Sequence, residues 1–488
     1  MKAISYIDYR GYDLLHKGTE ILSQIECNGI HIDLEYCKKK LDQIADTIRE
    51  LEKQIQDEPE VKIWMESYGR KFNLDSSTQL ADLLFNRLKI EPVNMTEKGN
   101  PSTDEESIEC LKNDHPFIEK LIQIKRLKKL CSTYISNFIQ EQVDGILHNF
   151  FHLHTTQTYR SSSSDINFQN IPDRNPKLGN IIRRAIIPRQ DRMLLELDYS
   201  GLEVRVAACY HKDPVMIKEI TEPGRDMHRD TAIELFLLNP NDVTSELRFT
   251  AKNSFVFAQF YGDYYANCAK NIWNSILLYD LKTRTGVSIR EHLSDKGIKT
   301  YSDFENHVKS VEYRFWNEKF RVYKKWKENM WDNYQKTGVV NMHTGFICRG
   351  LMRRNQVINY PVQGAAFHCL LWSLIHLQRL FLRNHLRSMI VGQIHDSIVI
   401  DVVPEELNCV MNWAHTIMTK EIRKVWDWII VPLDIKAEAS LPNESWANKK
   451  EIKLGSPCRS CGSEWSFKKK LEENNTEDHC IVCGEITE

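Results

Sequence analysis

Apolar residues along the chain follow two spacings, and these divide it into helical and strand-forming regions. Residues 11–56 and 118–138 place apolar side chains three or four positions apart, the spacing of an amphipathic helix. Residues 193–197 form a short apolar run with the length of a buried strand, and a helical stripe begins at Leu202. The chain therefore opens with helices and continues into a strand followed by a helix.

A hairpin is predicted over residues 388–403. Two apolar stretches flank a polar tip that carries His395 and Asp396. Asp198 ends the earlier apolar run in a similar way. Acids at a sheet edge are suitable ligands for a hard divalent cation. For Asp198 alone, a cap on the following helix is the commoner explanation.

Two cations on one predicted helix form a second candidate cluster. Arg248 and Lys252 are four residues apart and share a helix face. Adjacent cations favour a polyanion beside them, such as a triphosphate. Two solvated surface charges are the alternative. Residues 277–311 carry no pattern to which we can assign a chemistry.

Composition adds limits to this picture. A chain of 488 residues has room for roughly three domains. Its net charge of -2 does not indicate a nucleic-acid-binding protein, although residues 125–129 and 174–192 are locally basic. No run of about 18 apolar residues occurs, so no membrane span is expected. The first residues lack the apolar core of a signal peptide, and we expect a cytoplasmic protein.

The cysteines predict a metal site. Nine of the thirteen are scattered, and the other four form two close pairs near the C-terminus, each followed by glycine: Cys458, Cys461, Cys480 and Cys483. Two such pairs are typical of a tetrahedral zinc site. Four thiolates leave no open position, so the zinc is expected to be structural. Redox-active thiols are the alternative.

Together these motifs resemble the polymerase region of family A DNA polymerases, over about residues 12–445. Asp198-Tyr199-Ser200 and His395-Asp396 resemble the two carboxylate motifs, and Arg248, Lys252 and Tyr261 the nucleotide-binding helix. The resemblance implies an α+β right-hand fold, with helices around an antiparallel palm sheet. The implied domains are thumb and N-terminal helices at 1–150, palm at 151–224 and 345–450, fingers at 225–344, and a zinc ribbon at 455–488.

The resemblance also implies roles for individual residues. Asp198 and Asp396 would hold two Mg²⁺ ions, and Lys252 would be the proton donor to pyrophosphate. Glu203 would exclude a ribose 2′-hydroxyl. The implied nucleotide-binding residues are Glu203, His228, Arg248, Lys252, Phe257 and Tyr261, and the implied DNA contacts are Arg160, Arg174, Asn359, Gln363 and His395.

Three positions depart from the family pattern. Lys252 and Tyr261 are nine residues apart, one more than usual, and we predict a π-bulge that returns Phe257 and Tyr261 to the working face. Ser397 stands where a second acid usually follows Asp396. Gly201 stands where the family usually has glutamine.

The resulting prediction is a template-directed DNA polymerase that extends a primer with deoxynucleoside triphosphates and does not proofread. An RNA-synthesising relative and an inactive nucleic-acid-binding protein are the alternatives. Expected partners are primer–template DNA and a separate exonuclease or replication protein bound through the zinc ribbon, with no membrane. We expect replication in a bacterial or phage-infected cell, and a phage-like enzyme.

Overall fold

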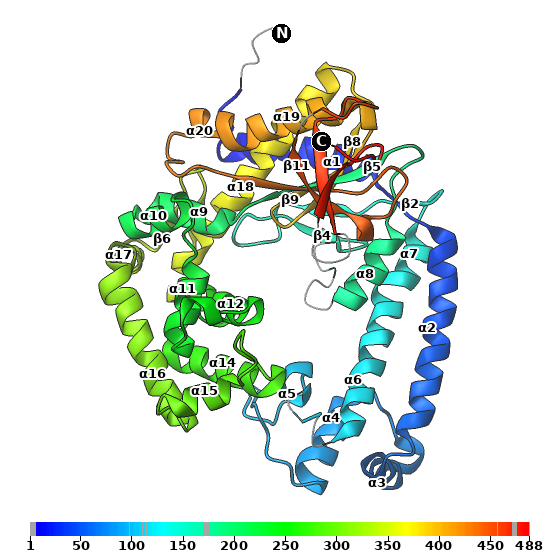
Figure 1. Cartoon of the computed structure of the whole chain (residues 1–488), viewed down its shortest axis with the longest axis vertical. Coiled ribbons are helices and arrows are strands. Elements are labelled where there is room, and N and C mark those ends of the chain that lie inside the picture. Colours follow the sequence, from blue (N-terminus) through cyan, green and yellow to red (C-terminus); the bar gives the residue numbers. More distant parts are fainter. Residues whose placement is uncertain are drawn as a thin grey trace.

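The computed structural model describes residues 6–487, except residues 97, 110, 113–114, 169–170, 172–175, 456 and 471–475. A sheet-bearing block carries two helical arms, which lie on either side of a central gap between the ribbons (Figure 1). Helices and strands are mixed and the main sheet is antiparallel, as expected for the predicted α+β fold.

The main sheet has seven strands in the order β13-β12-β11-β10-β5-β9-β8. Every neighbouring pair is antiparallel. Its strands are β5 (Met193–Tyr199), β8 (Met389–Ile394), β9 (Ser397–Val402), β10 (Ile435–Ala439), β11 (Lys450–Leu454), β12 (Trp465–Lys470) and β13 (Thr476–Cys480). The predicted hairpin is therefore confirmed as β8 and β9, with His395 and Asp396 between them.

Three two-stranded ladders lie outside the main sheet. They pair β1 (Ile30–His31) with β2 (Ile146–Leu147), β3 (Phe150–His152) with β4 (Ser162–Ser164), and β6 (Val339–Asn341) with β7 (Ile347–Arg349). The helices of the sheet-bearing block are α1 (Tyr12–Asn28), α9 (Leu202–His211), α18 (Arg354–Arg383), α19 (Leu407–His415) and α20 (Ile422–Val425).

The first arm follows the N-terminal helical pattern and has its own small core around Trp64 and Phe117. Ser76 caps α4 by accepting a hydrogen bond from the N–H of Gln79, a common role of serine at the start of a helix. The helices of this arm are α2 (Leu34–Ile55), α3 (Pro59–Tyr68), α4 (Ser77–Ala81), α5 (Glu105–Glu109), α6 (Pro116–Lys129), α7 (Ser136–Glu141) and α8 (Pro176–Ala185).

The second arm shares the main hydrophobic core with the sheet. Its helices are α10 (Pro214–Thr221), α11 (Met227–Phe236), α12 (Ser245–Ala251), α13 (Ala258–Phe260), α14 (Tyr265–Tyr279), α15 (Ile289–Asp295), α16 (Tyr301–Arg314) and α17 (Arg321–Thr337). Between α12 and α13 the chain is π-helical over Lys252–Phe257, so the predicted bulge is confirmed.

Helix α18 is the main apolar element behind the sheet. Among the described residues it is the one helix long and apolar enough to cross a membrane. However, 89% of that apolar window is buried inside the protein, as is usual for a core helix of a globular domain. The burial explains its composition without a membrane.

Candidate functional site

The pairing of β5 with β9 brings two aspartates together, Asp198 on β5 and Asp396 in the turn directly before β9. Asp198 is opposite Ser397 on β9 and opposite Lys436 on β10. Asp396 comes directly before Ser397, and its carbonyl oxygen accepts a hydrogen bond of 3.3 Å from the N–H of Tyr199. Residues distant in sequence, 198 and 396, are thus brought side by side by the β5–β9 pairing.

The carboxylate of Asp396 is suited to a cation. Its Oδ1 atom is buried and has no hydrogen-bond partner among the described residues. The guanidinium of Arg160 is 3.7 Å away. Burial raises the pKa of Asp396 to about 6, and the nearby charges of Glu203 and Asp198 act in the same direction. Burial also raises the pKa of Asp198 to about 6, with a further contribution from Glu196. Two carboxylates that repel each other favour a shared divalent ion.

Glu203 is held in the first turn of α9 by partners from two other segments. Nη1 of Arg160 lies 3.1 Å from its Oε1, and the hydroxyl of Tyr261 donates to its Oε2. The main-chain oxygen of Tyr261 accepts a hydrogen bond of 2.9 Å from Nδ2 of Asn359. A small pocket lined by Glu203, Phe257, Tyr261, Asn359 and Gln363 lies beside this cluster.

The cationic cluster on the second arm also forms, although one of its members is paired. Nε of Arg248 donates to Asp226 at 2.7 Å. Lys252 has no carboxylate partner among the described residues, and its ammonium lies 5.3 Å from the ring centroid of Phe257. Burial, together with the charges of Arg248 and Lys252, lowers the pKa of His228 to about 4, so its imidazole is neutral near pH 7.

The π-helical turn brings the aromatic residues of this helix together with its cations. The rings of Phe257 and Tyr261 are 6.2 Å apart, and the imidazole of His228 lies 5.7 Å from Phe257. A straight α-helix would place Tyr261 opposite Lys252, because nine steps rotate by about 900°. The extra residue is absorbed between Lys252 and Phe257, where the prediction required it.

The predicted DNA contacts fall into two groups. Asn359 and Gln363 lie on α18 beside the Glu203 pocket, and His395 lies at the tip of the β8–β9 hairpin with φ +50°. Gln393 donates to the His395 carbonyl oxygen at 2.6 Å and thereby supports that tip. Arg174 lies outside the described residues.

The two further departures from the family pattern have simple structural settings. The hydroxyl of Ser397 donates to the carbonyl oxygen of Ile394 at 2.9 Å and closes the hairpin tip. Gly201 precedes α9 with φ +61°. This left-handed conformation costs other residues about 1 kcal/mol or more, which explains a glycine there.

Two residues beside the site were not identified from sequence. Asp226 caps α11 and orients Arg248, and its position before a helical run was the available signal. Lys327 lies against the segment that follows the π-helical turn, with its ammonium 3.6 Å from the ring centroid of Trp316 and 3.2 Å from the Gln259 carbonyl oxygen. Burial lowers the pKa of Lys327 to about 7. No local pattern marks Lys327 among its neighbouring lysines.

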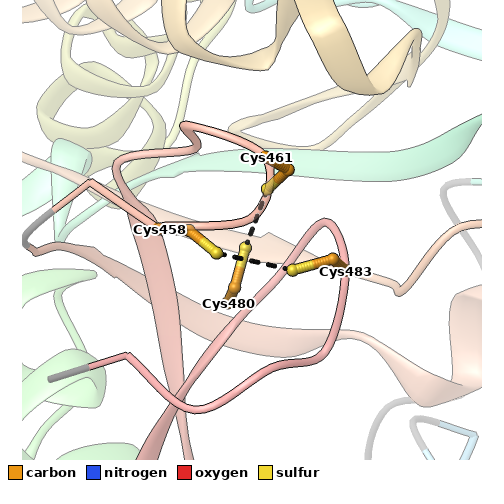
Figure 2. Close-up of side chains that lie close together, drawn as sticks. All are labelled: Cys458, Cys461, Cys480 and Cys483. Carbon is orange, nitrogen blue, oxygen red and sulfur yellow. Dashed lines mark hydrogen bonds between the residues drawn. The ribbon is translucent and has the colours of Figure 1, made fainter.

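The four C-terminal cysteines converge on one point (Figure 2). All four sulfur atoms lie within 4.8 Å of one another, and the Cys458–Cys483 and Cys461–Cys480 pairs are each 3.5 Å apart. A tetrahedral zinc with Zn–S bonds of about 2.3 Å requires sulfur separations of about 3.8 Å. The donor set and its spacing therefore fit zinc.

Two tight turns hold these cysteines. Gly462 and Gly484 donate N–H bonds of 2.8 and 2.9 Å to the carbonyl oxygens of Cys458 and Cys480. Both glycines have positive φ, which explains the glycine after each pair. Backbone N–H groups of Cys461 and Ser460 lower the pKa of Cys458 and so favour its thiolate, whereas burial raises the pKa of Cys461 and Cys483 in the protein without metal.

Comparison with known proteins gives one consistent result. The model of DNA polymerase family A matches residues 35–448. DNA polymerase I of Lactococcus lactis subsp. cremoris is 30% identical over 418 residues, which are 85% of this chain and 43% of that protein. The thermostable DNA polymerase I of Thermus thermophilus is 28% identical over 448 residues, 89% of this chain and 48% of the relative.

The fold of the chain is similar to that of a solved polymerase domain. The POL domain of Pol1 from M. smegmatis, solved in complex with DNA primer–template and dNTP, matches with a TM-score of 0.69 and 22% sequence identity. The match covers 89% of this chain and 70% of that one. The chain spans less than half the length of the two polymerase I relatives described above.

Proposed function

Because this chain belongs to the family A DNA polymerases, we propose that it is a template-directed DNA polymerase that adds deoxynucleotides to a primer 3′ end. The observation that carries the proposal is the pair formed by Asp198 and Asp396, in which one buried oxygen of Asp396 has no hydrogen-bond partner among the described residues. Arg248 and Lys252 stand on the neighbouring arm, where a triphosphate requires cations.

We propose that Asp198 and Asp396 hold two Mg²⁺ ions. When bound, such ions activate the primer hydroxyl and neutralise charge on the triphosphate and the leaving pyrophosphate. The carboxylates must be ionised for this role, and their raised pKa values are those of the protein without metal. Ser397 adds no charge, so these two residues supply the acidic ligands of our proposal.

The second arm would bind the nucleotide. Lys252 is free to contact the triphosphate and to give a proton to the pyrophosphate oxygen. Arg248, fixed by Asp226, would contact the same group, and neutral His228 would act as a hydrogen-bond donor. Phe257 and Tyr261 would pack against the incoming base and sugar.

Glu203 would select the sugar. Arg160 and Tyr261 each contact one oxygen of its carboxylate, so the side chain that would fill the space of a ribose 2′-hydroxyl is held from two sides. This arrangement supports DNA synthesis over RNA synthesis. Arg160, Asn359, Gln363 and His395 would contact primer and template around it, and Arg174, for which the proposal rests on sequence alone, would lie near the new pair.

We also propose that this chain does not proofread and that its four cysteines hold one structural zinc ion. The model of the polymerase family matches residues 35–448, which are most of the chain. The four cysteines follow this region, and a zinc ion bound by all four would have no open coordination position. A separate exonuclease or replication protein would be the partner of this module. Loss of nucleotides from a primer 3′ end in the presence of the purified chain would contradict the first proposal.

Primer extension tests the polymerase proposal. The wild-type chain with Mg²⁺ should extend a primer–template, and Asp396→Ala should lose at least about 100-fold in rate, since an active-site metal contributes several kcal/mol to the transition state. Asp295→Ala, which changes an exposed aspartate at the end of α15, is the matched control and should be unaffected. No extension by the wild type would favour an inactive nucleic-acid-binding protein.

A further inference from the structure

The four-cysteine module is part of the main sheet. β12 pairs with β11 over Ile452–Leu454 and Trp465–Phe467, and β11 pairs with β10, which borders the strand of Asp198. β12 and β13 are therefore the outer strands of the sheet that carries the aspartates (Figure 1). Asp198 lies on β5, three strands from β12.

The module also shares the hydrophobic core of the sheet. Ile452, Phe467 and Ile481 are at most 4% exposed and belong to the same core as Leu195 and Leu197 of β5. A small module that folds on its own would have a separate core. Burial of these three side chains therefore depends on, and contributes to, the packing of the catalytic sheet.

Asn408 of α19 fastens the first cysteine turn to the sheet-bearing block. Its Nδ2 donates to the carbonyl oxygen of Gly462 at 3.3 Å, and its Oδ1 accepts from the N–H of Glu464 at 3.2 Å. One amide side chain thus contacts the backbone at two places directly after the Cys458–Cys461 pair. This contact holds the cysteine turn in a fixed position relative to α19.

An ion-pair network runs across the sheet from β11 to β5. Its members are Glu196, Lys436, Glu438, Lys449 and Glu451. Lys449 bridges Glu196 and Glu438, and Lys436 contacts Glu438 at 2.7 Å and Glu451 at 3.5 Å. Glu196 is two residues before Asp198 on one strand, so both side chains face the same side of the sheet.

If the four-cysteine module became disordered, the ion-pair network on the neighbouring strands would be weakened. A two-stranded hairpin is marginal by itself, and the free energy of metal binding in such a module is free energy of folding. Without the metal, β11 would lose its outer neighbour and the apolar side chains beneath it would be exposed. Lys449 and Glu451 would then be held less firmly, and Glu196 and Glu438 would lose part of their compensating charge beside Asp198.

We propose that the metal ion held by Cys458, Cys461, Cys480 and Cys483 is a structural cofactor of the polymerase sheet itself. By ordering β12 and β13 it keeps β11 and the ion-pair network in register next to Asp198. The proposal rests on the zinc site proposed above and adds that this site acts on the catalytic sheet.

The test uses the full chain before and after removal of its metal. Metal is stripped with a zinc chelator, the chelator is removed, and Mg²⁺ is supplied again. We expect one zinc per chain before stripping. After stripping, Tm should fall by more than about 5 °C, and the rate of primer extension should fall about tenfold or more, with recovery on addition of Zn²⁺. The Mg²⁺ concentration for half-maximal rate should also fall at least about threefold, because carboxylates beside Asp198 that lose compensating charge attract the cation more strongly.

Two variants sharpen this test. Asn408→Ala keeps all four cysteines, so it should retain zinc and show a smaller fall in Tm through loss of the α19 contact. Cys27→Ser removes an exposed cysteine far from the module in sequence and should change neither zinc content nor rate.

The outcomes separate the two proposals. A purified chain without zinc would contradict the zinc site. A chain that holds one zinc, yet keeps its Tm, rate and Mg²⁺ requirement when stripped, would overturn the coupling to the sheet and leave the module as an independent appendage.

Discussion

The carboxylate of Glu203 is held by two partners, Arg160 and Tyr261, one at each oxygen. Arg160 binds one carboxylate oxygen and Tyr261 the other, so the side chain is only 18% exposed although it lines an open site. A lone glutamate in a first helical turn is commonly explained by the helix dipole. In our proposal, this carboxylate occupies the space beside the sugar of the incoming nucleotide.

Replacement of Glu203 by alanine should let ribonucleotides in. Removing the side chain opens room for a 2′-hydroxyl, and discrimination in favour of deoxynucleotides should fall by about 10- to 200-fold. Glu203→Gln keeps the volume and should keep most of the discrimination. The ratio of kcat/KM for dATP and ATP measures this, and an unchanged ratio in Glu203→Ala would rule out the sugar-selecting role.

Lys327 should make the stability of the chain depend on pH. Burial lowers its folded-state pKa from 10.5 to about 7. Between pH 7 and 10.5 the unfolded chain therefore binds more protons, so this residue's destabilising effect is full below pH 7 and fades as pH rises. The Tm difference between Lys327→Met and wild type should shrink from pH 7 to pH 9.5. A difference that is constant with pH would contradict the assignment.

At the scale of elements, the π-helical turn accommodates one extra residue between α12 and α13, the helix that we propose binds the nucleotide. Arg248 and Lys252 lie before or at its start, and Phe257 and Tyr261 lie at or after its end. The turn was predictable because Lys252 and Tyr261 are one residue further apart than is usual in the family. A straight helix with 3.6 residues per turn would therefore place them on opposite faces.

Deleting Asn253 should convert this turn to α-helix and keep the site. The residue is exposed and lies inside the π segment, so its loss should leave both ends in place and extension within about tenfold of wild type. Deleting Phe249, also exposed, would rotate Lys252 by about 100° relative to Arg248 and should abolish most activity. Equal losses in both deletions, measured by primer extension with Tm as control, would contradict the account.

Elements with a clear local pattern were predicted, and contacts between distant elements were not. The strand before Asp198 and the hairpin that carries Asp396 follow from short continuous apolar runs that end at polar residues. The pairing of Arg248 with Asp226 and the position of Lys327 depend on tertiary packing. The spacing of apolar residues along the chain does not indicate which of several lysines or arginines pairs with an acid or is buried in the folded protein.

At the scale of the whole molecule, the main addition of the structure is the continuity of its sheet. Sequence patterns predicted the zinc ligands and the acidic residues separately, because both are local signals. The strand order that joins them depends on pairing between β11 and β12, which depends on burial of Ile452 and Phe467 against the common core. The sequence alone therefore indicated an appended module, whereas in the structure its strands extend the main sheet.

The central claim is template-directed DNA synthesis at Asp198 and Asp396, and single-nucleotide incorporation tests it most directly. Four primer–templates that differ only in the first unpaired template base are each offered the four dNTPs one at a time. Each template should accept its complementary nucleotide far faster than the others, in wild type and in Asp295→Ala, and none should be extended appreciably by Asp198→Ala. Incorporation that ignores the template base, or that persists in Asp198→Ala, would contradict the account.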